Sequence, residues 1–184
     1  MMRLPQRPHN GSAEPFITQI KVGLSYIAHN QLIVTMIAMI SVSMLFGLGY
    51  ATLLPAFAAD ILRTDEAGLG GLNAAGGIGA LVGSLLVASL GRFRGKGDLL
   101  IAATLIFPLF IGVFALSRSF PLSCLLLAAI GFGFVIQTSL LTTSLQSLVP
   151  DALRGRVLAV YALAFFGTTP FAALFAGATA QAWG

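Results

Sequence analysis

Five long apolar segments follow one another along the chain and are separated by short polar loops. They span residues 31–58, 68–90, 98–117, 121–148 and 156–182. A helix needs about 20 apolar residues to cross a hydrocarbon core of about 30 Å, so each segment is long enough to span a membrane. No Asp, Glu, Lys or Arg lies in the interior of any of them. The pattern predicts an all-α fold, a polytopic membrane helix bundle with about five transmembrane helices.

Two different patterns precede the first apolar segment. Residues 1–15 are rich in proline and polar residues, which predicts a flexible tail. Over residues 16–30, apolar positions recur at helical spacing with polar residues between them: Phe16, Ile20, Leu24 and Ile27. This predicts an amphipathic helix in the membrane interface, and a loop is the alternative.

The composition agrees with a membrane location for residues 31–184. Of the 184 residues, 57% are hydrophobic and 9% are charged. Soluble domains carry roughly 25% charged residues, because polar groups have to cover a solvated surface. So few charges cannot cover a water-soluble body of this size, and a lipid bilayer is the expected partner of the bundle.

The basic residues predict an orientation. Successive loops lie on alternate sides of a membrane, and the cytoplasmic side carries the excess of Lys and Arg. One set of loops, which includes the N-terminal tail, holds eight basic residues: Arg3, Arg7, Lys21, Arg92, Arg94, Lys96, Arg154 and Arg156. The other set holds Arg63 and Arg118. We expect a cytoplasmic N-terminus and, with five spans, a C-terminus outside. The net charge of +4 is then a topology signal, and no nucleic-acid partner is expected.

The fourth apolar segment carries most of the polar side chains of the predicted bundle. They form a stripe at helical spacing: Thr138, Thr142 and Gln146, with Ser139 and Thr143 beside them. The stripe faces either a neighbouring helix or a water-filled cavity. Gln137 is the stronger candidate for a cavity or interhelical contact, because a buried amide needs hydrogen-bond partners in lipid.

The second apolar segment is dense in small residues. Gly76, Ala80 and Gly83 lie on one helical face, and Gly79 and Gly83 form a small-xxx-small pair. Small residues allow two helices to approach closely in lipid. Tight packing in one bundle and a sliding interface both fit this spacing.

The residues needed for acid–base or metal chemistry are missing from the apolar segments. Both histidines, His9 and His29, lie in the N-terminal region, and no carboxylate lies at membrane depth. The single cysteine, Cys124, sits in an apolar run and is expected to be a small buried hydrophobe. A membrane enzyme, a metal site and a bound cofactor are therefore not expected.

Three stretches of the chain are recognisable. QSLVPDALRGRV at 146–157 resembles the cytoplasmic link between the tenth and eleventh helices of the major facilitator superfamily. GYATLLPAFAADIL at 49–62 and LGGLNAAGGIGALVGSLL at 69–86 resemble its seventh and eighth helices. The chain is thus similar to the C-terminal half of such transporters, helices seven to eleven. It is most similar to the bacterial permease subgroup that includes the enterobactin exporter.

The resemblance implies two six-helix halves that rock around a central site. It implies these cavity candidates: Phe46, Tyr50, Asn73, Gln137, Tyr161 and Phe165. Asp151, Arg154 and Arg156 match the family's cytoplasmic loop, where they form ion pairs in one access state or act only as a topology signal and helix cap.

The function implied by the resemblance is transmembrane transport of a small-molecule substrate, in the direction of efflux, in the bacterial cytoplasmic (inner) membrane. The chain would be part of a permease whose N-terminal half comes from elsewhere. The alternative is a truncated, non-transporting membrane protein that acts as an assembly or regulatory subunit.

Overall fold

The computed structural model describes residues 16–89, 95–168 and positions 170, 171, 174, 177 and 178. The predicted flexible tail, residues 1–15, lies outside the described residues. The elements in chain order are α1 (Phe16–Ala28), α2 (Gln31–Ala56), the π-helical turn η1 (Phe57–Ile61), α3 (Glu66–Ser89), α4 (Lys96–Leu116), α5 (Phe120–Leu148) and α6 (Asp151–Gly167). The described part of the chain is helical and contains no strand, so the predicted all-α fold is confirmed.

Four stretches of helix in the described residues are long and apolar enough to cross a membrane. They are Gln31–Ile61, Glu66–Ser89, Gly97–Leu116 and Phe120–Leu148. Their outward faces carry large exposed apolar side chains, among them Leu85 on α3 and Leu109 on α4. Such faces are stable in lipid and not in water. The fifth predicted span, 156–182, starts inside α6 and runs into positions outside the described residues. The chain is a multi-pass membrane protein.

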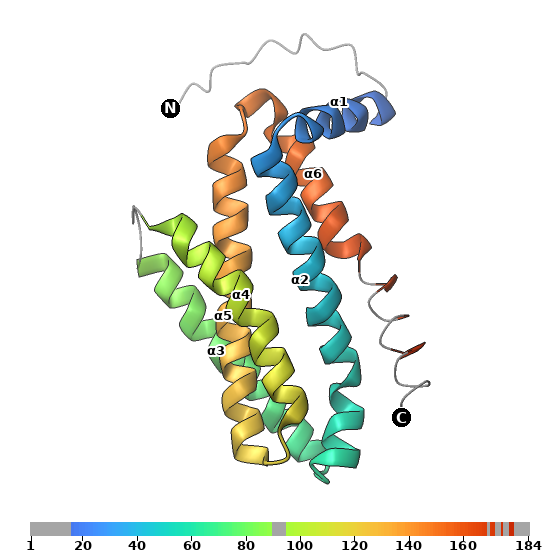
Figure 1. Ribbon diagram of the computed structural model, residues 1–184, viewed down its shortest axis with the longest axis vertical. Coiled ribbons are helices and arrows are strands. Elements are labelled where there is room, and N and C mark those ends of the chain that lie inside the picture. The colour runs from blue at the N-terminus through green and yellow to red at the C-terminus, as the bar shows by residue number, and fades with distance from the viewer. Residues whose placement is uncertain (1–15, 90–94, 169, 172–173, 175–176, 179–184) are drawn as a thin grey trace, which may run out of the picture.

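The helices form one bundle with α1 lying across its end (Figure 1). In this view α2 and α5 extend over most of the length of the bundle. Helix α3 packs most extensively on α5, and α4 packs on α5 and on α2. Helix α6 contacts α1, α2 and α5. Helix α5 is therefore the central element, and it carries the largest set of buried side chains.

Small residues bring α3 and α5 together. Gly79 and Gly83 are buried, and a Cβ on Gly83 would lie 2.8 Å from the carbonyl oxygen of Phe132. A Cβ on Gly131 of α5 would overlap the carbonyl group of Gly76. The small-residue face predicted from the sequence therefore packs directly against the α5 backbone, as small residues do between membrane helices. Of the two readings of this spacing, close packing is the one that the structure displays.

The link between α5 and α6 is short and fixes how the two helices face each other. Val149 and Pro150 both have extended ψ angles, and Val149 is buried. Proline at position 150 disfavours a helical residue before it, so α5 ends at Leu148. Helix α6 then begins at Asp151, whose carboxylate in the first turn complements the helix dipole. The chain returns beside α5, and the polar end of α5 faces the aromatic side chains of α6.

Candidate substrate cavity

A cavity of about 500 Å³ lies between α5 and α6. It is lined by Thr138, Ser139, Thr142 and Thr143 from α5 and by Tyr161, Ala162, Phe165 and Phe166 from α6. Ligand sites of small molecules commonly occupy about 300–1,000 Å³ and combine an apolar wall with a few polar groups. The cavity between α5 and α6 has both properties.

The polar wall of this cavity comes from the stripe on α5. The hydroxyl of Thr138 donates to the carbonyl of Phe134 at 2.9 Å, and that of Thr142 donates to the carbonyl of Thr138 at 2.8 Å. Thr143 donates in the same way to Ser139 at 2.8 Å. A threonine hydroxyl that donates to a carbonyl of its own helix adds little free-energy cost in a membrane. The helix thus holds three hydroxyl oxygens at fixed positions on the wall.

The aromatic wall comes from α6. Tyr161 is 8% exposed, and its hydroxyl oxygen lies 3.3 Å from that of Thr142. The ring centroids of Tyr161 and Phe165 are 6.3 Å apart, and those of Phe165 and Phe166 are 5.0 Å apart. These separations are typical of interacting aromatic pairs. The three rings form the aromatic part of the cavity lining.

A second cavity, of about 350 Å³, adjoins the first. Phe165 and Phe166 line both of them. Its other walls come from α2, α4 and α5 and are almost entirely apolar: Met44, Gly47, Tyr50, Phe107, Gly131 and Phe134. The two cavities together offer a polar compartment next to an apolar one, which suits an amphipathic molecule.

Gln137 lies one residue from the cavity wall but points elsewhere. Its side chain is fully buried, and its Nε2 donates to Ser43 Oγ on α2 at 2.7 Å and to Thr104 Oγ1 on α4 at 3.1 Å. The amide therefore links three helices near the middle of the bundle. Its Oε1 is buried without a partner among the described residues. Gln137 is an interhelical contact in this structure.

Ser43 and Thr104 also line a third cavity, of about 300 Å³, between α2 and α4. Phe46 lies in its wall together with Phe107 and Pro108. Phe46 is 49% exposed and does not line the other two cavities. This third cavity is almost wholly apolar apart from its hydroxyl groups.

The six predicted cavity residues are thus distributed over several places. Tyr161 and Phe165 line the α5–α6 cavity, and Tyr50 lines the adjoining one with Phe165. Phe46 lies in the third cavity, and Gln137 is buried between helices. Asn73 is exposed on α3, where its amide donates to the carbonyl of Leu69 at 3.0 Å.

Sequence reasoning did not assign several lining residues to the site. The hydroxyl stripe on α5 was visible as a pattern, but the sequence did not show that α6 faces it. Phe166, Met44 and Phe134 gave no signal, because apolar residues in an apolar helix look alike whichever way they face. Ser43 and Thr104 could have been found as isolated hydroxyls in apolar helices, which often mark an interhelical hydrogen bond.

The residues of the predicted cytoplasmic loop lie at the start of α6. Asp151 and Arg154 form an ion pair at 2.6 Å, with side chains 87% and 41% exposed. The two residues are one turn apart on the same helix, so the pair moves with α6 and contributes little to stability. Arg156 packs against α1, where a Cβ on Gly23 would lie 3.2 Å from the Arg156 Cβ.

Comparison with known proteins identifies the class. The profile of the transmembrane secretion effector family matches residues 2–184. The chain belongs to this family, which is part of the major facilitator superfamily of membrane transporters.

Among curated proteins, the multidrug efflux pump Tap of Mycolicibacterium fortuitum is 28% identical over 134 residues. The match covers 73% of this chain and 32% of Tap, so the chain spans about a third of the length of this relative. No solved structure matches the chain.

Proposed function

We propose that the chain is part of a permease that carries small amphipathic molecules out of the cell, with the α5–α6 cavity and its apolar neighbour as the substrate site. The observation that carries the proposal is the pairing of these two cavities at Phe165 and Phe166. The family, and the multidrug efflux for which the relative is named, support the direction of transport.

The two compartments have different tasks in this proposal. The hydroxyl groups of Thr138, Thr142 and Tyr161 bind the polar end of the substrate. Tyr50, Phe107 and Phe134 contact its apolar body. Neither cavity is lined by a charged residue, so binding relies on hydrogen bonds and on area removed from water.

The transporting unit in this proposal contains helices from a further N-terminal half. In this proposal the chain supplies helices seven to eleven, from the C-terminal half, and belongs with the permease subgroup that includes the enterobactin exporter. The length of Tap supports this, because two thirds of that relative lies outside the match. Asn73 also supports it, because its amide is exposed on a membrane helix. The free-energy cost of a polar group in lipid falls when another helix or water faces it.

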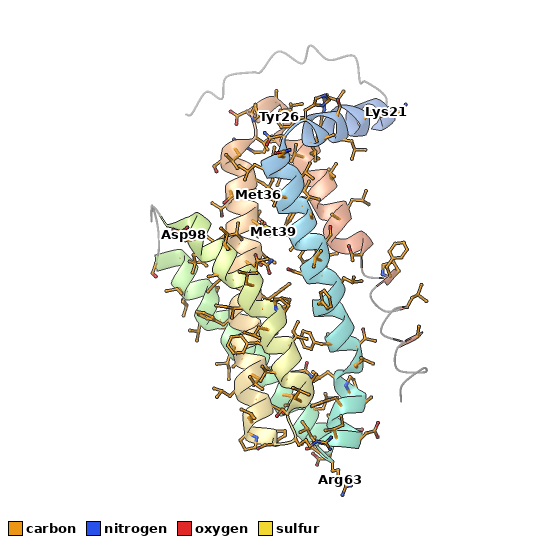
Figure 2. The ribbon with its side chains drawn as sticks, viewed as in Figure 1. Lys21, Tyr26, Met36, Met39, Arg63 and Asp98 are labelled. Carbon is orange, nitrogen blue, oxygen red and sulfur yellow. The ribbon has the colours of Figure 1, made fainter. Side chains whose placement is uncertain are left out.

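We place the protein in the bacterial inner membrane with the N-terminus in the cytoplasm and the C-terminus outside. Lys21 on α1 and Arg63, between η1 and α3, lie at opposite ends of the bundle (Figure 2). The α1 end also holds the start of α6 with Arg154 and Arg156, so the basic residues gather there. This end is cytoplasmic by the positive-inside rule.

Cysteine labelling tests this orientation. In a Cys124→Ala background, single cysteines replace Ser119, between α4 and α5, and Ser147, at the end of α5. A membrane-impermeant maleimide added to intact spheroplasts should label Ser119→Cys, and label Ser147→Cys only after the membrane is opened. The reverse labelling order would overturn the orientation.

The test of the function is substrate efflux from cells that express the chain alone or with a six-helix N-terminal half of a related permease. Phe165→Ala should reduce efflux at equal expression, because it opens the wall of both cavities. Leu163→Ala is the matched control, since Leu163 lies on the same helix and is 67% exposed. Efflux that is absent with and without the partner half, or that falls equally in both variants, would refute the proposed site.

A further inference from the structure

The cavity between α2 and α4 lies outside the proposed substrate site. Among the described residues, Phe107 is the one that it shares with either of the other two cavities. It lies at mid-depth, because Ser43 is near the middle of α2 and Thr104 near the middle of α4. Val42 and Phe46 in its wall are exposed, so its edge reaches the outer surface of the described bundle. A ligand would therefore enter from the lipid.

Ser43 brings an unused hydrogen to this cavity. Its oxygen accepts from Gln137 Nε2 at 2.7 Å, and its own hydrogen has no acceptor among the described residues. Ser41, on the same helix, instead donates to the carbonyl of Ile37 at 2.9 Å. Ser43 is 4% exposed, and a buried donor without an acceptor costs free energy. Because Ser43 lines the cavity, an acceptor placed there can take this hydrogen.

Pro108 leaves an unused acceptor on α4. A helix carbonyl accepts from the N–H four residues later, and proline has no N–H. The carbonyl of Thr104 therefore lacks its donor from position 108, which lies inside the helix. Thr104 and Pro108 both line the cavity, so this carbonyl lies on the cavity side of α4.

The donor and the acceptor come from side-by-side residues. Gln137 Nε2 donates both to Ser43 Oγ at 2.7 Å and to Thr104 Oγ1 at 3.1 Å, so Ser43 and Thr104 meet at one nitrogen. A ligand hydroxyl has one hydrogen and two lone pairs. It can accept from Ser43 and donate to the Thr104 carbonyl. A ketone or an ether would serve Ser43 alone, and a hydrocarbon would serve neither group.

The rest of the wall suits an aromatic ring. Phe46, Phe107 and Met39 line it, and rings and thioethers both pack well on aromatic ligands. The Phe107 ring is buried and lies 5.7 Å from the Phe134 ring between centroids, so its position is fixed by packing. The volume of about 300 Å³ is at the lower end of the range of about 300–1,000 Å³ for ligand sites, which favours a small molecule.

We propose that the cavity between α2 and α4 binds a small phenol from the lipid. The phenol hydroxyl lies between Ser43 and the Thr104 carbonyl, and the ring lies against Phe46 and Phe107. The site is separate from the proposed substrate site and does not depend on the proposed function. A water molecule would leave the aromatic wall uncovered, and a lipid acyl chain would leave both polar groups unpaired.

The test is photolabelling of the full chain in phosphatidylcholine nanodiscs with a phenol that carries an alkyl diazirine. Peptide mass spectrometry should place the label on the residues of α2 and α4 that line the cavity. At equal concentration in the membrane, 4-tert-butylphenol should compete about fivefold better than tert-butylbenzene, the effect of roughly one hydrogen bond. Equal competition, or label at other helices, would overturn the proposal.

Variants locate the hydroxyl contact. Ser43→Ala removes the donor, and Pro108→Ala restores an N–H for the Thr104 carbonyl. Each should remove most of the preference for the phenol, and the ratio of the two competitors reports this even where a variant changes the binding of both. Ser41→Ala is the matched control, because the Ser41 hydrogen is already used within α2 and Ser41 does not line the cavity. A preference that survives both variants, or that is lost in the control as well, would refute the contact.

One further variant separates this site from the substrate site. Phe165→Ala opens the α5–α6 cavity and its neighbour, and Phe165 does not line the cavity between α2 and α4. Labelling should therefore stay as in the wild type, whether or not efflux falls. Labelling that is lost in Phe165→Ala would place the phenol in the substrate site and overturn the separate site.

Discussion

Gly79 of α3 lies directly against the carbonyl oxygen of Ala128 on α5, in space that a Cβ would overlap. The contact is between two backbones, so it leaves no side chain that could rotate away. Gly77, two residues earlier on the same helix, has open space at its Cβ position. The two glycines lie on the same helix and have opposite surroundings.

We therefore expect Gly79→Ala to destabilise the protein and Gly77→Ala to leave it unchanged or slightly more stable. Overpacking of this kind costs about 1–3 kcal/mol, whereas alanine improves helix propensity by about 1 kcal/mol. The measurement is thermal unfolding in detergent, followed by the reaction of the single Cys124 with a thiol-reactive dye. Equal unfolding midpoints for the two variants would contradict the α3–α5 contact.

The hydrogen bond from Gln137 to Ser43 should appear as an energetic coupling. Interhelical hydrogen bonds in membrane proteins have coupling energies of about 0.6 kcal/mol on average and up to about 1.7. A double-mutant cycle of Ser43→Ala and Gln137→Met, measured by unfolding in mixed micelles, should give a value in this range. A cycle of Gln137→Met with Ser84→Ala, on α3, should be additive within about 0.5 kcal/mol. No coupling in the first cycle would show that the two side chains act independently.

The contact of α1 with α6 depends on the absence of a side chain at Gly23. The Cβ of Arg156 lies 3.2 Å from where a Cβ on Gly23 would stand, so the larger Gly23→Val side chain should push α1 away from α6. Cleavage by trypsin at Lys21 in inside-out vesicles should then become several-fold faster, because the local opening is more populated. Ser25→Val, at an exposed position of α1, serves as the control for helix propensity. The same rate in both variants would argue against the packing of α1 on α6.

The ion pair of Asp151 and Arg154 should matter little for stability. Both side chains are well exposed, and such pairs are weakened by water and salt. Asp151→Asn should change the free energy of unfolding by less than about 1 kcal/mol, including the loss of the charge at the start of α6. A larger loss would mean that Asp151 has a partner beyond its own helix turn.

The apolar pattern of the sequence was sufficient for the all-α membrane fold, because each helix must satisfy its own backbone in lipid. It was less informative where the chain is polar. The fifth apolar segment was expected to start at residue 156, whereas α6 begins at Asp151. The apolar pattern misses this start because the first turns of α6 contain Asp151, Arg154 and Arg156. A helix end in the headgroup region does not need apolar residues.

The facing of individual side chains could not be predicted from the sequence. Gln137 and Thr138 are neighbours in the chain, yet Gln137 points to α2 and α4 while Thr138 lines the cavity toward α6. Successive residues on a helix differ by about 100° in direction, so the choice of neighbour depends on how the helices pack. The sequence showed the stripe of hydroxyl groups on α5. It did not show that aromatic side chains of α6 face this stripe, because that depends on the tertiary structure.

Phe165 and Phe166 line both cavities, so the region that the two cavities share is bounded by movable side chains. An exposed side chain changes rotamer in roughly picoseconds to nanoseconds, far faster than a helix can shift. The two chambers could therefore merge or separate while every helix stays in place. Under the proposed function, a short substrate would need one cavity and a long one both, so the range of substrate lengths would depend on two χ1 angles of α6.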